Sequence, residues 1–405
     1  MLAPRWRVVV ALFAVTSCIA AAVSTFGVFL PVLSDTFGWS RGAVSVALSI
    51  SLLVGGVAAF VIGRVADRRG PRGVLAATVA LGAVGFALSA RIDALWHFYL
   101  SYGLFVGVGM SSIYVLSAAT VARWFETRRG MALAIVLSGF NLGWLTAGPL
   151  AAWLIARFGW RAAYLALGAL IAAVGVPASL CVSYPQSAEA RHVTADTGAR
   201  WPAGDRRLWY FVSAWGCLGF VYMMVPAHSV AYARDRGLPL EQASLTLTAF
   251  GLGAIVGRLV AGAAADHFGV GTTMRVCLVI QAAALVAFVA GLPAWAVPAA
   301  LVVFGLGGSG ADNTIVKAVP DAFGVAALAT IMSVVGLGWR GGAGLGPALA
   351  GFVYDLTGSY TPSFALGVVA IVAGWMFFRL GSASPTPPTP SGSGSSATGA
   401  CRSRR

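Results

Sequence analysis

Long apolar runs follow one another along almost the whole chain, and they constrain its fold more than any other feature. A run of about 20 apolar residues forms a helix that crosses a ~30 Å hydrocarbon core. Charged or turn residues bound twelve such runs, at 8–33, 42–66, 73–91, 94–121, 130–156, 160–183, 208–233, 242–265, 272–291, 294–317, 323–354 and 360–380. The sequence therefore predicts an all-α membrane protein with twelve transmembrane helices.

Composition excludes a water-soluble fold for most of the chain. Charged residues make up 10% of the 405 residues and hydrophobic residues 59%, whereas a soluble domain carries about 25% charged residues. So few charges cannot cover a surface that faces water, and lipid is therefore the expected solvent. The five cysteines form no CxxC pair, which predicts no metal site and no cofactor.

A polar stretch divides the runs into two sets of six. The expected segments are an N-terminal six-helix bundle at 1–183, a cytoplasmic central loop at 184–207, a C-terminal six-helix bundle at 208–380 and a disordered cytoplasmic tail at 381–405. The tail is rich in proline, serine and glycine, and such a composition cannot build a packed core.

The two sets of runs also resemble each other. The pattern Gly-x-x-x-Asp-x-x-Gly that begins at Gly63 recurs at Gly262, 199 residues later. A repeated pattern indicates duplication, so we expect two pseudo-symmetric bundles. Transporters built from such repeats bind substrate between the halves near the bilayer midplane and rock around it.

Cationic residues predict the orientation. With the N-terminus inside, 19 of the 27 arginine and lysine residues fall in cytoplasmic segments and 6 in external ones. This bias follows the positive-inside rule with both termini cytoplasmic. We therefore interpret the net charge of +14 as a topological signal and not as a nucleic-acid surface. The expected location is a bacterial inner membrane.

One loop motif resembles that of a known family. The segment from Gly63 to Arg72 is similar to the helix 2–3 loop of the major facilitator superfamily. Its glycines allow close helix approach and a tight turn, and its aspartate can accept hydrogen bonds from arginines across the cytoplasmic gate. The expected gate residues are Gly63, Asp67, Arg68, Gly70, Arg72 and, from the repeat, Asp266.

A finer resemblance covers nearly all of residues 8–380. Several segments are similar, in order and spacing, to the branch that contains the monocarboxylate transporters and the oxalate–formate antiporter. They lie at 26–29, 37–41, 124–132, 228–237, 257–266 and 346–360. The resemblance implies the major facilitator fold and a small carboxylate as substrate.

Two arginines inside the apolar runs are the main candidates for substrate binding. A buried arginine costs about 2.5–3.5 kcal/mol on insertion scales, so it usually faces a cavity and has a function. The resemblance assigns Arg258 to the substrate carboxylate, which a guanidinium can hold through two parallel hydrogen bonds. Arg340 lies at a position similar to that of a second cation in the antiporter branch, a lysine on the eleventh helix. For both arginines the alternative is an ion pair with Asp312, the one acid within the apolar runs.

Asp312 departs from the branch, which usually has an apolar residue or proline at this position. It could couple transport to protons or form a gate ion pair, and the sequence does not separate these roles. The monocarboxylate carriers share an acidic residue one turn before the arginine that corresponds to Arg258. This chain has Ala254 at that position, so it lacks the acid that usually couples transport to protons in that branch. His228 is a second candidate for proton coupling or gating, although a surface histidine is the commoner case.

Three further side chains are expected around the arginines. Asn141 and Trp339 lie at near-equivalent positions of the two halves, and Tyr114 lies on the fourth helix. Each could hydrogen-bond or enclose a small anion, and helix packing is an equally good explanation for each.

These observations predict a secondary active transporter of mono- or dicarboxylates that works by alternating access, as a proton symporter or an anion exchanger. The expected partners are the carboxylate, the bilayer, and protons or a counter-anion, with no nucleic acid. An enzyme is not expected. The alternatives are an efflux carrier for drugs or other hydrophobic compounds, which would favour an acid-lined cavity, and a sensor of the same fold that does not transport.

Overall fold

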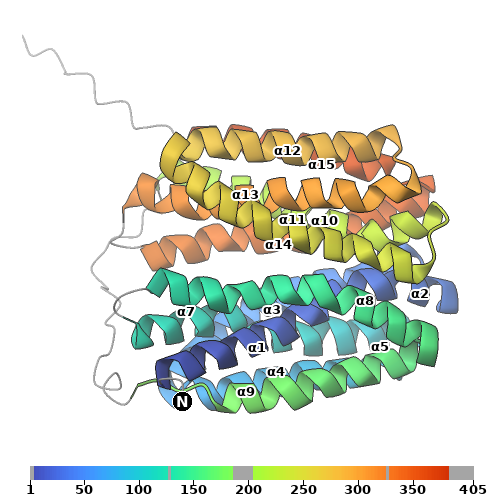
Figure 1. The fold of residues 1–405 in the computed structure, drawn as a ribbon, viewed down its shortest axis with the longest axis horizontal. Coiled ribbons are helices and arrows are strands. Elements are labelled where there is room, and N and C mark those ends of the chain that lie inside the picture. Colours follow the sequence, from blue (N-terminus) through green and yellow to red (C-terminus); the bar gives the residue numbers. More distant parts are fainter. Residues whose placement is uncertain (1–3, 126–128, 186–203, 325–327, 383–405) are drawn as a thin grey trace, which may run out of the picture.

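The computed structural model describes residues 4–125, 129–185, 204–324 and 328–382, and every regular element in them is helical. Figure 1 shows the helices running side by side in two groups, the first half of the chain below the second. We call the side that carries the N-terminus the terminal face and the opposite side the far face. All but the first two residues of the predicted tail, and most of the predicted central loop, lie outside the described residues, and those two residues belong to the last helix.

The first half contains six membrane crossings. Its elements are α1 (Pro4–Ser24), α2 (Phe26–Phe37), α3 (Arg41–Arg69), α4 (Pro71–Ser89), α5 (Leu95–Phe98), the π-helical η1 (Tyr99–Val106), α6 (Gly107–Met110), α7 (Ile113–Trp124), α8 (Arg129–Leu170), the π-helical η2 (Ile171–Gly175) and α9 (Val176–Leu180). The pair α1 and α2 makes the first crossing, and α5 to α7 make the fourth. Within α8, Gly159 has a φ of 79° and separates the fifth crossing from the sixth.

The second half repeats this plan with fewer interruptions. Its elements are α10 (Arg206–Asp235), α11 (Leu240–Phe268), α12 (Val270–Ala290), the 3-10 turn η4 (Ala294–Ala296), α13 (Val297–Phe323), α14 (Leu328–Thr357) and α15 (Thr361–Ser382). Nine stretches among the described residues meet the length and hydropathy of a membrane span. One of the nine stretches contains α8 and therefore covers two predicted runs. The interrupted fourth crossing and α14, which are not among the nine, correspond to the other two runs.

One predicted boundary is wrong. The eleventh run was expected at 323–354, but α13 continues through Phe323 and ends at Gly324, whose φ is 71°. Lys317, which the orientation count assigned to the cytoplasmic side at the end of the tenth run, therefore lies inside α13. The helical backbone extends beyond the apolar stretch, and the left-handed conformation that glycine tolerates ends it.

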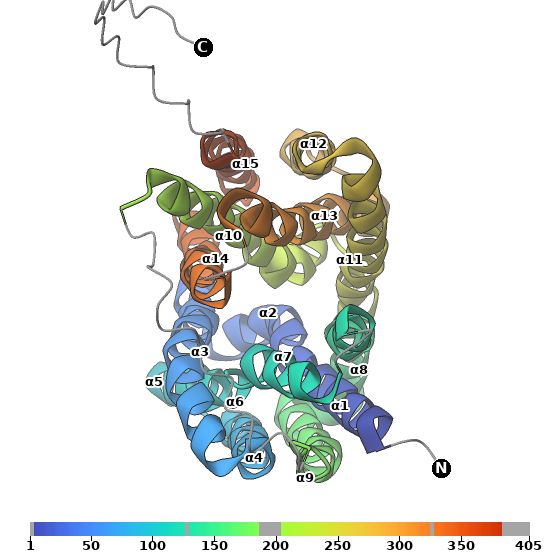
Figure 2. The same cartoon turned by 90° about the vertical axis from the view of Figure 1, so that its left-hand side faces the viewer.

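The halves meet along two pairs of helices. Figure 2 shows α3 beside α14 and α8 beside α11. Small residues permit the first contact, because a Cβ built on Gly351 would lie 2.6 Å from the Cα of Gly42. In the second contact, the Thr248 hydroxyl donates a hydrogen bond of 2.8 Å to the Leu145 carbonyl. Interhelical contacts of this kind hold helices together where lipid removes the hydrophobic drive.

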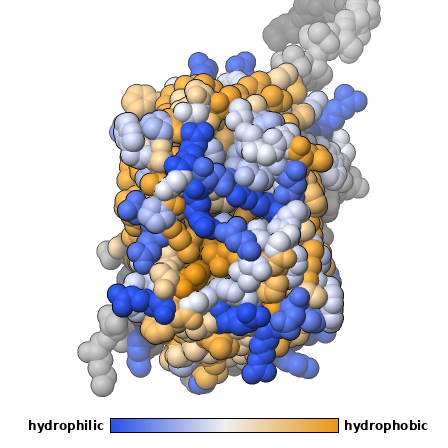
Figure 3. Space-filling model, turned by 90° about the vertical axis from the view of Figure 1, so that its right-hand side faces the viewer, coloured by the Kyte–Doolittle hydropathy of each residue, from blue (hydrophilic) through white to orange (hydrophobic). Residues whose placement is uncertain are grey.

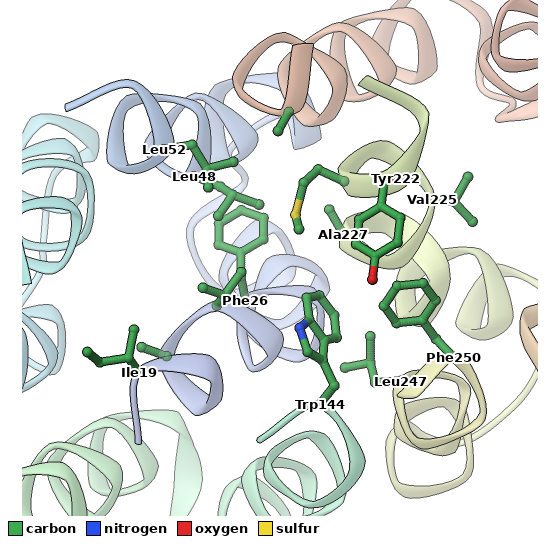
Figure 4. Close-up of a cluster of buried hydrophobic side chains, with 14 of the residues drawn as sticks. Ile19, Phe26, Leu48, Leu52, Trp144, Tyr222, Val225, Ala227, Leu247 and Phe250 are labelled. Atoms are coloured by element: carbon green, nitrogen blue, oxygen red, sulfur yellow. The ribbon is translucent and has the colours of Figure 1, made fainter. Parts of the chain in front are cut away.

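Apolar side chains fill the space between the halves (Figure 4). The Trp144 ring of the first half packs edge-on against Phe250 of the second, with 5.0 Å between ring centroids. The cluster also contains Ile19, Phe26, Leu48, Leu52, Tyr222, Val225, Ala227 and Leu247. This part of the interface is therefore apolar.

Two neighbouring glycines of α14 differ in the room around them, which gives a matched prediction. A Cβ built on Gly342 would overlap the Gly216 carbonyl oxygen of α10, whereas one built on Gly341 would meet no atom within 4 Å. We expect Gly342→Ala to lower the melting temperature in detergent by roughly 5 °C, because overpacking costs about 1–3 kcal/mol. Gly341→Ala should leave the melting temperature unchanged or raise it slightly. Equal melting temperatures for both variants would contradict this packing.

Candidate functional site

A charged cluster lies in the second half, in the interior of three of its long helices. Arg258 of α11 and Asp312 of α13 form an ion pair with 3.4 Å between Nη2 and Oδ2. The indole N–H of Trp215 on α10 donates a hydrogen bond of 2.7 Å to the other carboxylate oxygen, Oδ1. The Arg258 and Asp312 side chains remain 29% and 21% exposed, so neither is sealed inside protein.

Glycines of α11 bring this pair together. Cβ atoms built on Gly253 and Gly257 would overlap backbone atoms of Val302 and Leu306 on α13, so only glycine allows the two helices to lie this close. The helices run parallel, and the contact continues where the Asn313 amide donates to the Arg258 carbonyl at 3.4 Å. This register places Arg258 and Asp312 side by side.

Arg340 lies where α14 meets both halves. Its side chain packs against α3 of the first half, since a Cβ built on Gly56 would lie 3.0 Å from the Arg340 Cδ. One turn earlier on α14, a Cβ built on Gly336 would lie 3.9 Å from the Trp215 ring. Residues one turn apart share a helix face, so Arg340 lies on the face of α14 that also approaches the Trp215 ring, with its side chain against α3.

The structure selects between the alternatives for the ion pair. Asp312 pairs with Arg258, not with Arg340, among the ion pairs of the described residues. The ion pair that was the alternative to substrate binding for Arg258 is therefore present in this conformation. A distance of 3.4 Å is longer than the 2.7–2.9 Å of a tight charge-assisted bond, so a substrate carboxylate could compete with Asp312 for the guanidinium.

Two of the three further candidates face the space between the halves. Asn141 is 8% exposed and lies one turn before Trp144, on the face of α8 that packs against α11. The Trp339 ring lies 6.4 Å from that of Tyr222, which belongs to the apolar cluster between the halves (Figure 4). The side chain of Tyr114 lies outside the described residues, although its backbone belongs to α7.

An apolar cavity of about 170 Å³ lies elsewhere, within the first half. It is bounded by α1, α4, α8 and η2, and its lining includes Cys18, Phe86, Leu142 and Val174. No charged residue lines it, so it does not suit an anion. The charged cluster of the second half is the better candidate for the site.

The predicted gate motif lies on the terminal face. Gly70, with a φ of 80°, ends α3 and places Pro71 at the first turn of α4. Asp67 accepts a hydrogen bond of 3.3 Å from Arg123 of α7. In the second half Asp266 pairs with Lys317 of α13. Each aspartate thus joins the second crossing of its own half to the fourth, while Arg68 and Arg72 are exposed.

On the far face, by contrast, ion pairs join the two halves. Arg41 at the start of α3 donates two hydrogen bonds of 2.6 Å to the carboxylate of Asp235 at the end of α10. Its guanidinium also lies 4.0 Å from the Tyr354 ring centroid. A second pair, Arg234 with Asp35, lies nearby at 2.8 Å. Figure 3 shows hydrophilic residues spread over this face.

A carboxylate of the second half caps a helix of the first. Asp355 of α14 accepts hydrogen bonds from the backbone N–H groups of Arg41 and Gly42, at 2.9 and 2.8 Å. These N–H groups belong to the first turn of α3, where no partner exists within the helix and negative charge is favoured. The far face is therefore closed by contacts that depend on both halves.

His228 joins this network and is fully buried, so the expectation of a surface histidine is wrong. Its Nδ1 lies 3.0 Å from the Tyr360 hydroxyl and its Nε2 lies 2.8 Å from the Pro347 carbonyl. Burial raises the pKa of Tyr360 above its ordinary value, which keeps the hydroxyl protonated. Arg41 donates to the Tyr360 oxygen at 3.0 Å, so the hydroxyl proton can go to Nδ1 and neutral His228 can donate from Nε2 to Pro347.

The sequence did not identify Arg41, Asp235 and Asp355 as a gate. It placed Arg41 among external loop cations, and Asp235 and Asp355 entered only through segments that resemble a family. A usable signal was present, because these charges lie at helix ends that the positive-inside rule assigns to the same face. Their pairing across the halves becomes visible only once α3 is known to pack beside α14.

The fold and this arrangement define a membrane transporter, with two helical halves and a charged cluster near the middle of the helices of the second half. The chain belongs to the Major Facilitator Superfamily, whose sequence profile matches residues 12–244 and 210–404. Proteins of this family are transporters and not enzymes.

Several relatives carry transporter names. Human monocarboxylate transporter 11 is 29% identical over 389 residues, which cover 91% of this chain and 81% of that protein. Monocarboxylate transporter 13 of Rattus norvegicus is 25% identical over 378 residues, 91% of this chain and 87% of that protein. The oxalate:formate antiporter of Oxalobacter formigenes is 25% identical over 242 residues, 59% of this chain and 58% of that protein.

Solved structures show the same fold. The nucleoside transporter NupG matches with a TM-score of 0.76 at 14% identity, and covers 94% of this chain and 100% of that chain. A bacterial homologue of the lysosomal transporter Spinster, in an inward-facing and unoccupied conformation, matches with a TM-score of 0.69 at 16% identity, over 94% of this chain and 96% of that chain.

Proposed function

We propose that this protein carries small organic anions, mono- or dicarboxylates, across the membrane as a secondary active transporter. The observation that carries the proposal is Arg258, a partly exposed guanidinium about 15 Å along α11 from its end on the terminal face. A cation at this depth is costly unless it serves a polar substrate or pathway. The names of the relatives support a carboxylate as that substrate.

The positions of the gates support alternating access. Interhalf ion pairs close the far face, while the two motif aspartates of the terminal face pair within their own halves. If the termini are cytoplasmic, as the distribution of cations predicts, this conformation is the inward-facing one. Asp235 and Asp355 would then release α3 when the external side opens.

Asp312 and His228 are the proposed groups for proton coupling or gating. Asp312 neutralises Arg258 in this conformation, and a substrate carboxylate would have to share or replace it. Protonation of Asp312 would free Arg258 and favour symport, whereas exchange of one anion for another would keep Arg258 occupied throughout. His228 contacts both halves, because its Nε2 also lies 3.4 Å from the Ser45 hydroxyl of α3, and it would therefore sense the opening of the far face.

The test is a counterflow panel in proteoliposomes. Proteoliposomes that contain the purified protein are loaded with unlabelled oxalate, formate, lactate, pyruvate or a larger acid. Uptake of each labelled acid is then measured with and without a pH gradient. We expect trans-stimulated uptake of at least one small carboxylate. A dependence on the pH gradient would identify symport, and uptake that requires an internal anion would identify exchange. Failure of every acid to drive counterflow would contradict the proposal.

A further inference from the structure

The ion pair between Arg258 and Asp312 is loose compared with another ion pair in the same protein. Its hydrogen bond runs from Nη2 of Arg258 to Oδ2 of Asp312 and is 3.4 Å long. On the far face, Arg41 donates two hydrogen bonds of 2.6 Å to the carboxylate of Asp235, which is a frequent arrangement of a guanidinium on a carboxylate. Asp312 therefore holds Arg258 weakly, although the two charged groups lie side by side.

A neutral donor holds Asp312 more closely. The indole N–H of Trp215 donates a hydrogen bond of 2.7 Å to Oδ1, so the shorter of the two bonds comes from a neutral group and not from the cation. An indole N–H can only donate, and its bonds to ionised acceptors are among the strong ones. The two donors belong to different helices, α10 and α11. A carboxylate that is oriented by Trp215 is thus turned away from a parallel, two-bond arrangement with Arg258.

Close packing of α10 against α14 fixes the backbone on both sides of Trp215. A Cβ built on Gly338 would overlap the carbonyl oxygen of Val212, and one built on Gly342 would overlap that of Gly216. Only glycine allows two helices to approach in this way. The indole projects from a part of α10 that has little room to shift along α14, so its N–H remains available to the same acceptor.

We propose that Trp215 is a positioning residue for substrate binding: it keeps Asp312 at a long distance from the Arg258 guanidinium, so that a substrate carboxylate can displace Asp312. The inference rests on the proposed carboxylate transport and identifies the group that regulates access to its cation. Without the indole N–H, Asp312 turns towards Arg258 and forms a tight pair, as Asp235 does with Arg41. Substrate must then compete against a tight ion pair in place of a loose one.

The experiment measures the half-saturation concentration and the maximal rate of counterflow uptake of labelled lactate or oxalate, in proteoliposomes at neutral pH without a pH gradient. Trp215→Phe removes the donor and keeps an aromatic ring. We expect the half-saturation concentration to rise roughly tenfold, because hydrogen bonds to charged groups shift an equilibrium by this order, while the maximal rate changes little. Trp209→Phe, the same change at an exposed position of the same helix, should alter neither value.

Trp215→Gln tests whether the donor or the ring is responsible. The amide nitrogen of glutamine is the same number of bonds from the backbone as the indole nitrogen, and it also donates hydrogen bonds. Its half-saturation concentration should therefore lie closer to that of the wild type than that of Trp215→Phe does. An equal increase in both variants would assign the effect to loss of the ring and would overturn the inference, as would an unchanged value in Trp215→Phe.

Asp312→Asn tests the competition itself. Asparagine keeps an acceptor for Trp215 but has no charge that attracts Arg258. We expect the half-saturation concentration to fall below that of the wild type, and the addition of Trp215→Phe should not raise it again. The fall is measurable even where Trp215→Phe alone yields little folded protein, and an absence of any fall would contradict competition by Asp312.

The double variant also separates this inference from the proposed function. If Trp215→Phe raises the half-saturation concentration equally with and without Asp312→Asn, Trp215 acts independently of Asp312 and the inference is wrong, while carboxylate transport stands. If the wild type takes up no carboxylate in counterflow, the proposed function itself is wrong and the role of Trp215 is excluded with it.

Discussion

Arg258→Ala is expected to reduce carboxylate uptake by about 100-fold or more. Removing one partner of a hydrogen-bonded charge pair costs about 2–5 kcal/mol when the pair is desolvated, as it becomes once substrate fills the site, and much of this cost arises because the remaining charge is left unpaired. Here the loss is double. The substrate loses its cation, and Asp312 loses the guanidinium that neutralises it at 3.4 Å. Initial rates of labelled lactate or oxalate uptake in proteoliposomes measure the effect.

A lysine at position 258 should restore only part of the activity. An ammonium keeps the charge, but it cannot form the two parallel hydrogen bonds that a guanidinium makes to a carboxylate. Arg275→Ala is a suitable control, since Arg275 is an exposed cation of α12. Its uptake should equal that of the wild type. Normal uptake by Arg258→Ala would exclude Arg258 from substrate binding.

The membrane crossings could be predicted from hydropathy, because each must present apolar side chains to lipid over a fixed length. Their ends could not be predicted equally well. The tenth apolar run was expected to end at Lys317, yet α13 continues through Phe323 and ends at Gly324, where the backbone conformation stops it. Hydropathy indicates whether a residue faces lipid or water, whereas glycine and proline indicate where a helix can end or turn.

The site shows a similar division. Arg258, Arg340 and Asp312 could be found from sequence because a charge within an apolar run is rare and costly. Which cation pairs with the acid depends on helix faces and on the close approach of α11 to α13, which Gly253 and Gly257 permit. Composition and periodicity do not contain that information.

The far-face gate depends on contacts between residues that are distant in sequence. The two carboxylates that accept hydrogen bonds from Arg41 belong to α10 and α14, 194 and 314 residues away in the sequence. The burial of His228 follows from the same packing, because its neighbours belong to α3 and to residues on either side of the end of α14. A single sequence gives no measure of such distances.

Arg41→Ala should open the far face. The substitution removes the bidentate bond to Asp235, the hydrogen bond to Tyr360 and the contact with the Tyr354 ring. Hydrogen bonds to charged groups contribute about 1.5–3 kcal/mol. We therefore expect the population open at the far face to rise about tenfold to 100-fold.

Cysteine labelling can measure this shift. Ala227 is 5% exposed and lies between the halves, as Figure 4 shows, so a cysteine there is protected while the far face is closed. In intact cells, with the five native cysteines replaced by alanine, a membrane-impermeant maleimide should label Ala227→Cys about tenfold faster or more when Arg41→Ala is also present. The result would also support an external position for the far face.

Arg234→Ala is the matched control for this gate. Arg234 also pairs across the halves, with Asp35, but their side chains are 34% and 63% exposed, against 15% for Arg41. Exposed ion pairs contribute about 0–1 kcal/mol, so labelling should rise less than about fivefold. Equal effects of the two variants would mean that charge on this face, and not the enclosed geometry around Arg41, holds it shut. No effect of either would assign closure to the apolar cluster around Trp144 and Phe250, because that contact would then be sufficient by itself.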